Sequence, residues 1–127
     1  MSTQKINFVS PDEAVRLIES GDHVYIQGST SIPEVLCEAL ARRGNELKDV
    51  TLYSAFAVAK GPAPYCKPEF KDTFLVNSFF VSNSVRKWIA EGYGVTTPRF
   101  LGEVPELFRD GTCRVDVALI NCSEPDE

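Results

Sequence analysis

The sequence predicts one α/β domain over residues 1–127, with a Rossmann-like sheet that is rich in parallel strands joined by crossover helices. Three observations support this fold class. Helical and extended patterns alternate along the chain, and that order favours a parallel sheet. Glycines end the three longer helical segments. The 127 residues are 43% hydrophobic and 24% charged, which is ordinary for a soluble domain with its own core.

The first helix is predicted over residues 10–22. Ser10 is a good N-cap residue, and Glu13 three positions later completes a capping box. The apolar face of this helix comprises Ala14, Leu17 and Ile18. Gly21 ends the helix, and the segment HVYIQ (23–27) then predicts the first strand.

A turn of small residues, GSTS (28–31), follows that strand and leads to a second helix, which begins at Pro33 and stops at Gly44. Its residues at helical spacing are Leu36, Ala39, Leu40 and Arg43. The segment DVTLYSAF (49–56) predicts the second strand. Residues 57–71 contain three prolines and a glycine, and a loop of this length in a compact domain is more often functional than idle.

The second half of the chain continues the alternation. TFLVNSFFV (73–81) predicts a strand and SNSVRKWIAEGYG (82–94) a helix. The inward residues of that helix are Val85, Trp88 and Ile89. VTTPRFL (95–101) predicts a short extended piece or an edge strand, because Pro98 cannot donate to a ladder. GEVPELFRDG (102–111) predicts a short helix.

The last predicted strand is VDVALI (115–120). A strand so continuously apolar is expected in the centre of a sheet, buried on both faces. The sequence stops seven residues after it, with no helix to cover it. We therefore expect the chain to be part of something longer, and we expect the uncovered apolar surface to drive homo-oligomers in solution.

Composition excludes several function classes. The net charge of −5 disfavours nonspecific binding to nucleic acid. No run approaches the roughly 20 apolar residues of a membrane span, so no membrane partner is expected. The N-terminus lacks the order of a signal peptide, and a cytoplasmic location is the default expectation.

The four cysteines are scattered and there is only one histidine, His23. This pattern argues against a metal site and against a disulfide framework, so the cysteines are expected to be ordinary thiols. A triad of the Ser-His-Asp or Cys-His kind would have to use His23, and nothing near it supports one. No bound cofactor is predicted.

The turn that begins at Gly28 has two interpretations of equal weight. It lacks the patterns of a dinucleotide fold and of a P-loop, so the structural interpretation is a tight connection between strand and helix. The functional interpretation is a ligand site, because small residues let a ligand approach and amides at a helix N-terminus favour an anionic group. The residues alone name no nucleophile.

Placed end to end, the segments resemble the N-terminal domain of the acetyl-CoA hydrolase/transferase family, which includes 4-hydroxybutyrate and butyryl CoA-transferases. The matching stretches are GDHVYIQGSTSIPEVLCEALARR, LKDVTLYSAF, GPAPYCKPEF, FFVSNSVRKWIAEG, TPRFLGEVPELF and VDVALINCSEPDE. The most specific is the last, a V-D-V-A-L-I strand followed by S-x-P-D. The chain departs from the family at SNSVR, where relatives often have G-x-N-x-R, and at Tyr93, where they usually have arginine.

The resemblance implies a fold like that of ribose-5-phosphate isomerase and other CoA-transferases, repeated in two halves. It implies ping-pong chemistry with coenzyme A as a substrate, in which a glutamate carries CoA as a thioester. That glutamate is expected in a C-terminal half outside this sequence, so no catalytic residue is assigned here. This half is expected to supply backbone donors for a developing oxyanion and walls for the acyl group. The positions that match best are Gly28, Ser29, Thr30, Ser54, Ala55, Phe56 and Ala57.

The leading hypothesis is the N-terminal half of a CoA-transferase that acts on a short-chain acyl-CoA and a small carboxylate of the 4-hydroxybutyrate, butyrate or acetate type. An acyl-CoA hydrolase of the same fold is the first alternative, and a noncatalytic α/β ligand-binding or assembly module is the second. We expect residues 1–127 alone to be inactive in CoA exchange.

Overall fold

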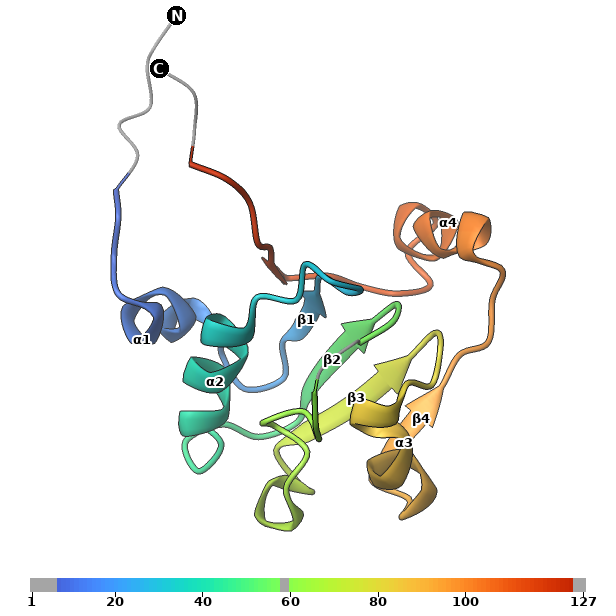
Figure 1. Cartoon of the computed structure of the whole chain (residues 1–127), viewed down its shortest axis with the longest axis horizontal. Helices are drawn as coiled ribbons and strands as arrows, with labels where there is room; N and C mark the ends of the chain where they lie inside the picture. Colours follow the sequence, from blue (N-terminus) through green and yellow to red (C-terminus); the bar gives the residue numbers. More distant parts are fainter. Residues whose placement is uncertain (1–6, 58–59, 125–127) are drawn as a thin grey trace, which may run out of the picture.

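The computed structural model describes residues 7–57 and 60–124, which form a five-stranded sheet flanked by helices (Figure 1). The strands are β1 (His23–Ile26), β2 (Val50–Ser54), β3 (Phe74–Ser78), β4 (Gly94–Thr96) and β5 (Val117–Leu119). Their order in the sheet is β4-β3-β2-β1-β5, and each neighbouring pair runs parallel. The parallel α/β class expected from the sequence is confirmed.

Helices supply most of the connections between these strands. They are α1 (Pro11–Ala14), α2 (Glu34–Arg42), α3 (Asn83–Ala90) and α4 (Val104–Arg109). Short 3₁₀ turns cover Val15–Leu17, Pro68–Phe70 and Leu101–Glu103. Figure 1 shows α1 beside α2, and α4 at the opposite end of the molecule from α1. No helix within the described ranges is long and apolar enough to cross a membrane.

The larger core lies on one face of the sheet. It includes Val24 and Ile26 of β1, Leu52 of β2 and Val76 of β3. The residues that cover this face from outside the sheet include Val15, Ile18, Cys37, Leu40, Val85 and Trp88. The helix α3 therefore turns Val85 and Trp88 inward, as the sequence predicted.

A smaller, aromatic core lies on the other face. Successive side chains of a strand point to opposite faces, so Tyr25, between Val24 and Ile26, points away from the larger core. The ring of Phe108 in α4 meets the rings of Tyr53 and Phe79 edge-on, at centroid distances of 5.7 and 5.9 Å. Of the helices that contribute to the two cores, only α4 covers this face.

The first helix is shorter than predicted. Ser10 is the N-cap, and its Oγ accepts a hydrogen bond from the Glu13 amide at 3.2 Å. The helix becomes a 3₁₀ turn at Val15, and Ile18 is already extended. As a result Val15 and Ile18 are buried while Leu17, predicted to face the core, is 61% exposed. The change of helical pitch rotates the apolar face by one residue.

The last strand lies at an edge of the sheet, so its predicted central position is wrong for this chain. β5 pairs with β1 on one side, and on its other side no described strand adjoins it. Only Val117–Leu119 form the ladder, and the flanking Val115 and Ile120 are exposed. Continuous hydrophobicity indicates burial, but it does not say which part of a protein covers the second side. The predicted edge strand is confirmed at β4, which ends the sheet on the opposite side.

Candidate functional site

A hollow of about 460 Å³ opens at the carboxyl ends of the first strands. It is lined by Tyr25, Gln27, Gly28, Ser29, Ala55, Phe56, Phe80 and Leu101. These residues follow or belong to different strands: the turn after β1, the loop after β2 and the segments after β3 and β4. In parallel α/β sheets ligands bind at this edge, because the loops that follow the strands converge there.

Two of these segments touch at the hollow. The Ser29 amide donates a hydrogen bond to the Phe56 carbonyl oxygen at 2.5 Å, and Ser29 and Ala57 form an isolated parallel bridge. A Cβ atom on Gly28 would lie 2.6 Å from the same carbonyl oxygen. Gly28 is therefore required for close packing of the turn after β1 against the loop after β2.

Ser29 has a φ of 59°, in the left-handed region that non-glycine residues seldom adopt. Backbone conformations of this kind collect at ligand-binding turns, where the surrounding structure holds them. Here the bridge to Ala57 holds Ser29 in this conformation.

The hollow offers backbone donors. The Ser29 amide is engaged with Phe56, whereas the amides of Gly28, Thr30, Ala55 and Phe56 donate no hydrogen bond to any described residue. Gly28, Ala55 and Phe56 also line the hollow, so three of these unengaged amides belong to residues of its lining. Such an arrangement can donate to an oxygen that gains negative charge.

The other predicted positions lie around the hollow and are not part of its lining. Thr30 lines a neighbouring hollow between the start of α2 and the segment after β5, which supplies Ile120 and Asn121. Ser54 is buried at the end of β2, and its Oγ has no hydrogen-bond partner among the described residues. Ala57 is buried, and its carbonyl oxygen accepts a hydrogen bond from Ser84 Oγ at 3.3 Å. The predicted set is therefore divided among adjoining spaces.

Sequence reasoning missed four lining residues, Tyr25, Gln27, Phe80 and Leu101. Phe80 follows β3 as Phe56 follows β2, and both side chains are partly exposed at the hollow. The rule that ligands bind at the carboxyl ends of parallel strands could have identified Phe80, since it ends the predicted strand 73–81. Leu101 comes from the connection to α4, whose course no local pattern predicts.

The electrostatics of the hollow are simple, because none of its lining residues is charged. Among the neighbouring strand residues, Tyr53 of β2 contacts His23 of β1 through a 3.0 Å hydrogen bond between its hydroxyl and Nδ1. Burial, with a contribution from Cys113, raises the pKa of Tyr53 and keeps the phenol neutral. Across the described ranges, no group of three His, Cys, Asp or Glu residues is placed to hold a metal ion.

These features define an α/β domain with an uncharged, donor-bearing hollow at the carboxyl edge of its sheet, and comparison with known proteins identifies the family. The Acetyl-CoA hydrolase/transferase N-terminal domain matches residues 3–127. The chain belongs to this family, and the resemblance noted in the sequence is confirmed.

Curated relatives are similar over nearly all of the chain. It is 35% identical over 118 residues to a succinyl-CoA:acetate/propanoyl-CoA:succinate CoA transferase of Fasciola hepatica, covering 91% of this chain and 24% of that protein. It is 34% identical over 123 residues to the 4-hydroxybutyrate coenzyme A transferase of Clostridium kluyveri, covering 97% and 28%. The chain thus spans about a quarter of the length of these relatives.

Solved structures show the same fold. RipA from Yersinia pestis aligns with a TM-score of 0.74 at 24% identity, over 87% of this chain and 27% of that one. A 4-hydroxybutyrate CoA-transferase from Porphyromonas gingivalis aligns with a TM-score of 0.66 at 25% identity, over 94% and 25%. The CoA-transferase-like fold that the resemblance implied is confirmed, for a chain that covers part of each neighbour.

Proposed function

We propose that this chain forms the N-terminal part of a CoA-transferase that moves CoA between a short-chain acyl-CoA and a small carboxylate of the acetate, butyrate or 4-hydroxybutyrate type. The observation that carries the proposal is the hollow at the carboxyl edge, whose largely apolar lining includes three residues with unengaged amides, Gly28, Ala55 and Phe56. Family membership and the names of the relatives support CoA transfer as the general reaction.

The proposed chemistry uses a glutamate outside residues 1–127. Its carboxylate attacks the thioester carbonyl and expels CoA as a thiolate, which leaves a mixed anhydride of the acyl group and the glutamate. The thiolate then attacks the glutamyl carbonyl, so that the acyl group leaves as a free carboxylate and CoA is held as a glutamyl thioester. The incoming carboxylate attacks this thioester and takes the CoA through the same two steps in reverse. Each attack on a carbonyl carbon builds negative charge on the carbonyl oxygen. Amides directed at that oxygen stabilise the transition state by about 2.7–4 kcal/mol each. The role proposed for Gly28, Ala55 and Phe56 is to supply these amides.

The walls of the hollow favour a short apolar acyl group. Tyr25, Phe56, Phe80 and Leu101 present aromatic and aliphatic surface, and no charged side chain lines the space. An acyl chain of two to four carbons gains by burying its methylene groups there, at about 0.8 kcal/mol for each. A second carboxylate on the acyl group would find no basic partner among the described lining residues.

A chimera tests the proposal. Residues 3–127 replace the matching N-terminal part of the butyryl-CoA:acetate CoA-transferase of Anaerostipes caccae, which is 32% identical over 117 residues. We expect the chimera to transfer CoA from butyryl-CoA to acetate. The matched control carries Gly28→Val, which forces the two loops apart and is expected to lower kcat while substrate is still bound. A folded chimera without transfer activity contradicts the proposal, and CoA release that needs no acetate identifies a hydrolase instead.

The chain alone supplies a second test. Incubation with butyryl-CoA followed by borohydride reduces any glutamyl thioester and changes the mass of one peptide. We expect no modified peptide from residues 1–127. A modified glutamate within them would contradict the assignment of the nucleophile to another part of the protein.

A further inference from the structure

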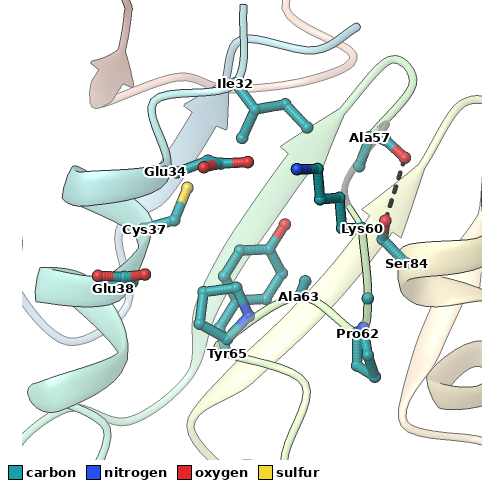
Figure 2. Close-up of a pocket in the computed structure, with 12 residues that line it drawn as sticks. Ile32, Glu34, Cys37, Glu38, Ala57, Lys60, Pro62, Ala63, Tyr65 and Ser84 are labelled. Carbon is teal, nitrogen blue, oxygen red and sulfur yellow. Dashed lines mark hydrogen bonds between the residues drawn. The ribbon is translucent and has the colours of Figure 1, made fainter. Parts of the chain in front are cut away.

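A further pocket, of about 250 Å³, lies between α2 and the loop after β2 (Figure 2). Its walls come from α2, from the proline-rich loop after β2 and from the start of α3. The polar side chains that line it include Glu34, Cys37, Lys60 and Tyr65. Of the residues assigned to the candidate site, Ala57 alone borders this pocket.

Tyr65 forms the floor of the pocket. The residue is 3% exposed, and its ring meets Phe74 edge-on at 6.4 Å between centroids. Figure 2 shows its hydroxyl directed into the pocket, and that hydroxyl makes no hydrogen bond to any described residue. Burial raises the pKa of the phenol, so it remains a neutral donor. Because this hydroxyl has no protein partner and faces the open space, it can donate a hydrogen bond to a molecule bound in the pocket.

Opposite charges face each other above this floor. In Figure 2 the Lys60 ammonium and the Glu34 carboxylate point toward one another from opposite walls, and no ion pair joins them in the described part of the chain. Glu38 lies one helical turn beyond Glu34 on the same wall. Cys37 between them is a neutral thiol, because burial raises its pKa to about 12. The pocket therefore presents a positive and a negative group across an open space.

We propose that this pocket binds a small zwitterion, an α-amino acid with a short apolar side chain. Its carboxylate would accept hydrogen bonds from Lys60 and Tyr65, and its ammonium group would donate to Glu34. Ile32, Pro62 and Ala63 line the rest of the space and suit an aliphatic side chain. A simple anion meets the repulsion of Glu34 and Glu38, and a simple cation meets that of Lys60. A ligand with both charges satisfies all of these groups.

The ligand chemistry is tested by titrating ¹⁵N-labelled chain with L-valine and following amide shifts. Isobutylamine and 3-methylbutanoate serve as controls, because each keeps the aliphatic part and one of the two charges. We expect L-valine to shift amides around Tyr65 and Glu34 and to bind at least about tenfold more tightly than either control. Equal binding of all three compounds, or no shift with L-valine, would overturn the proposal.

Substitutions separate recognition from folding. Tyr65→Phe removes only the hydroxyl and keeps the ring contact with Phe74. Lys60→Met removes the charge from an exposed side chain. Each is expected to weaken L-valine binding about tenfold. Lys71→Met, an exposed lysine outside the pocket lining, is the matched control and should leave affinity unchanged. Unchanged affinity in both the Tyr65→Phe and the Lys60→Met variants would show that L-valine binds elsewhere.

Discussion

At Gly28, the absence of a side chain has a direct structural purpose. A Cβ there would meet the Phe56 carbonyl oxygen at 2.6 Å, a contact that backbone atoms cannot relieve without moving. We predict that Gly28→Ala lowers the free energy of unfolding by about 1–3 kcal/mol, measured by urea denaturation. Gly61→Ala is the control, because a Cβ at Gly61 has no neighbour within 4 Å. Equal stability of the two variants would contradict the close approach.

The cysteines differ in their expected reactivity. Burial raises the pKa of both Cys37 and Cys66 from 9.0 to about 12, which lowers their thiolate fraction near neutral pH about a thousandfold. Cys113 is buried as well, whereas Cys122 is exposed. We predict that iodoacetamide at about pH 8 alkylates Cys122 first. Peptide mass spectrometry over time checks the order, and early labelling of Cys37 would show that α2 is not packed as described.

For single residues, the sequence identified the turns that border the hollow, but not which of their backbone amides already have a hydrogen-bond partner. The small residues at Gly28 and the loop after Ser54 identified two segments that do meet at one hollow. The engagement of the Ser29 amide with Phe56 depends on the distance between two loops. No local pattern contains that distance, so the sequence could not say which amides remain available.

Among the secondary-structure elements, α1 and its 3₁₀ turn are held by an arginine from the end of α2. Arg43 Nη1 donates to the carbonyl oxygens of Val15 and Ile18, at 2.5 and 2.8 Å. We predict that Arg43→Met lowers the free energy of unfolding by about 1–3 kcal/mol, since two partly buried carbonyl groups lose a charged donor.

The neighbouring Arg42 provides the comparison. It forms an exposed ion pair with Asp12 at 2.7 Å, and such pairs contribute about 0–1 kcal/mol. Thermal denaturation of Arg42→Met should therefore show a much smaller shift in Tm than that of Arg43→Met. A larger effect from Arg42 would mean that the surface ion pair, and not the carbonyl contacts, anchors the N-terminal segment.

The edge strand β5 depends on Asp116. Its carboxylate accepts hydrogen bonds from Arg114 Nε and from the His23 amide of β1, both at 2.8 Å. The hydrogen bond from Arg114, together with that from His23, holds the pKa of Asp116 below its ordinary value. The unfolded chain takes up this proton at a higher pH, so the stabilisation is present above about pH 4 and is lost as pH falls through the native pKa.

We predict that Asp116→Asn removes this part of the pH dependence. Urea denaturation of the two proteins should show a stability difference at pH 6 that shrinks as the pH approaches 3. A difference that stays constant over this range would show that the carboxylate charge of Asp116 does not link β5 to β1.

Elements were predicted well where one periodic pattern dominates and less well at the ends of the chain. The helices α2 and α3 and the strands β1 to β3 lie within their predicted ranges. The prediction that Leu17 of the first helix faces the core was wrong, because a change from α to 3₁₀ geometry depends on the packing of Val15 and Ile18. The predicted central position of β5 in the sheet was wrong, because an apolar sequence does not specify which strands lie beside it.

For the whole molecule, the main feature is that the two faces of the sheet are covered to different extents. The aromatic core protects the region beneath α4, but Leu75 of β3, Val95 of β4 and Val115 beside β5 remain exposed. Large exposed apolar areas are typical of interfaces. We predict oligomers of the 127-residue chain at micromolar concentration, measured by light scattering after gel filtration. A clean monomer that binds no hydrophobic dye would contradict this prediction.

The pairing of β1 with β5 also has a consequence for biosynthesis. His23 and Asp116, which join these strands, are 93 positions apart. A ribosome that adds about 5–20 residues per second needs about 5–20 s to produce the second after the first. During that interval one edge of β1 has no partner, and its unsatisfied amides and carbonyls are open to other chains. The nascent protein therefore passes through a period in which chaperones that shield strand edges would have the most effect.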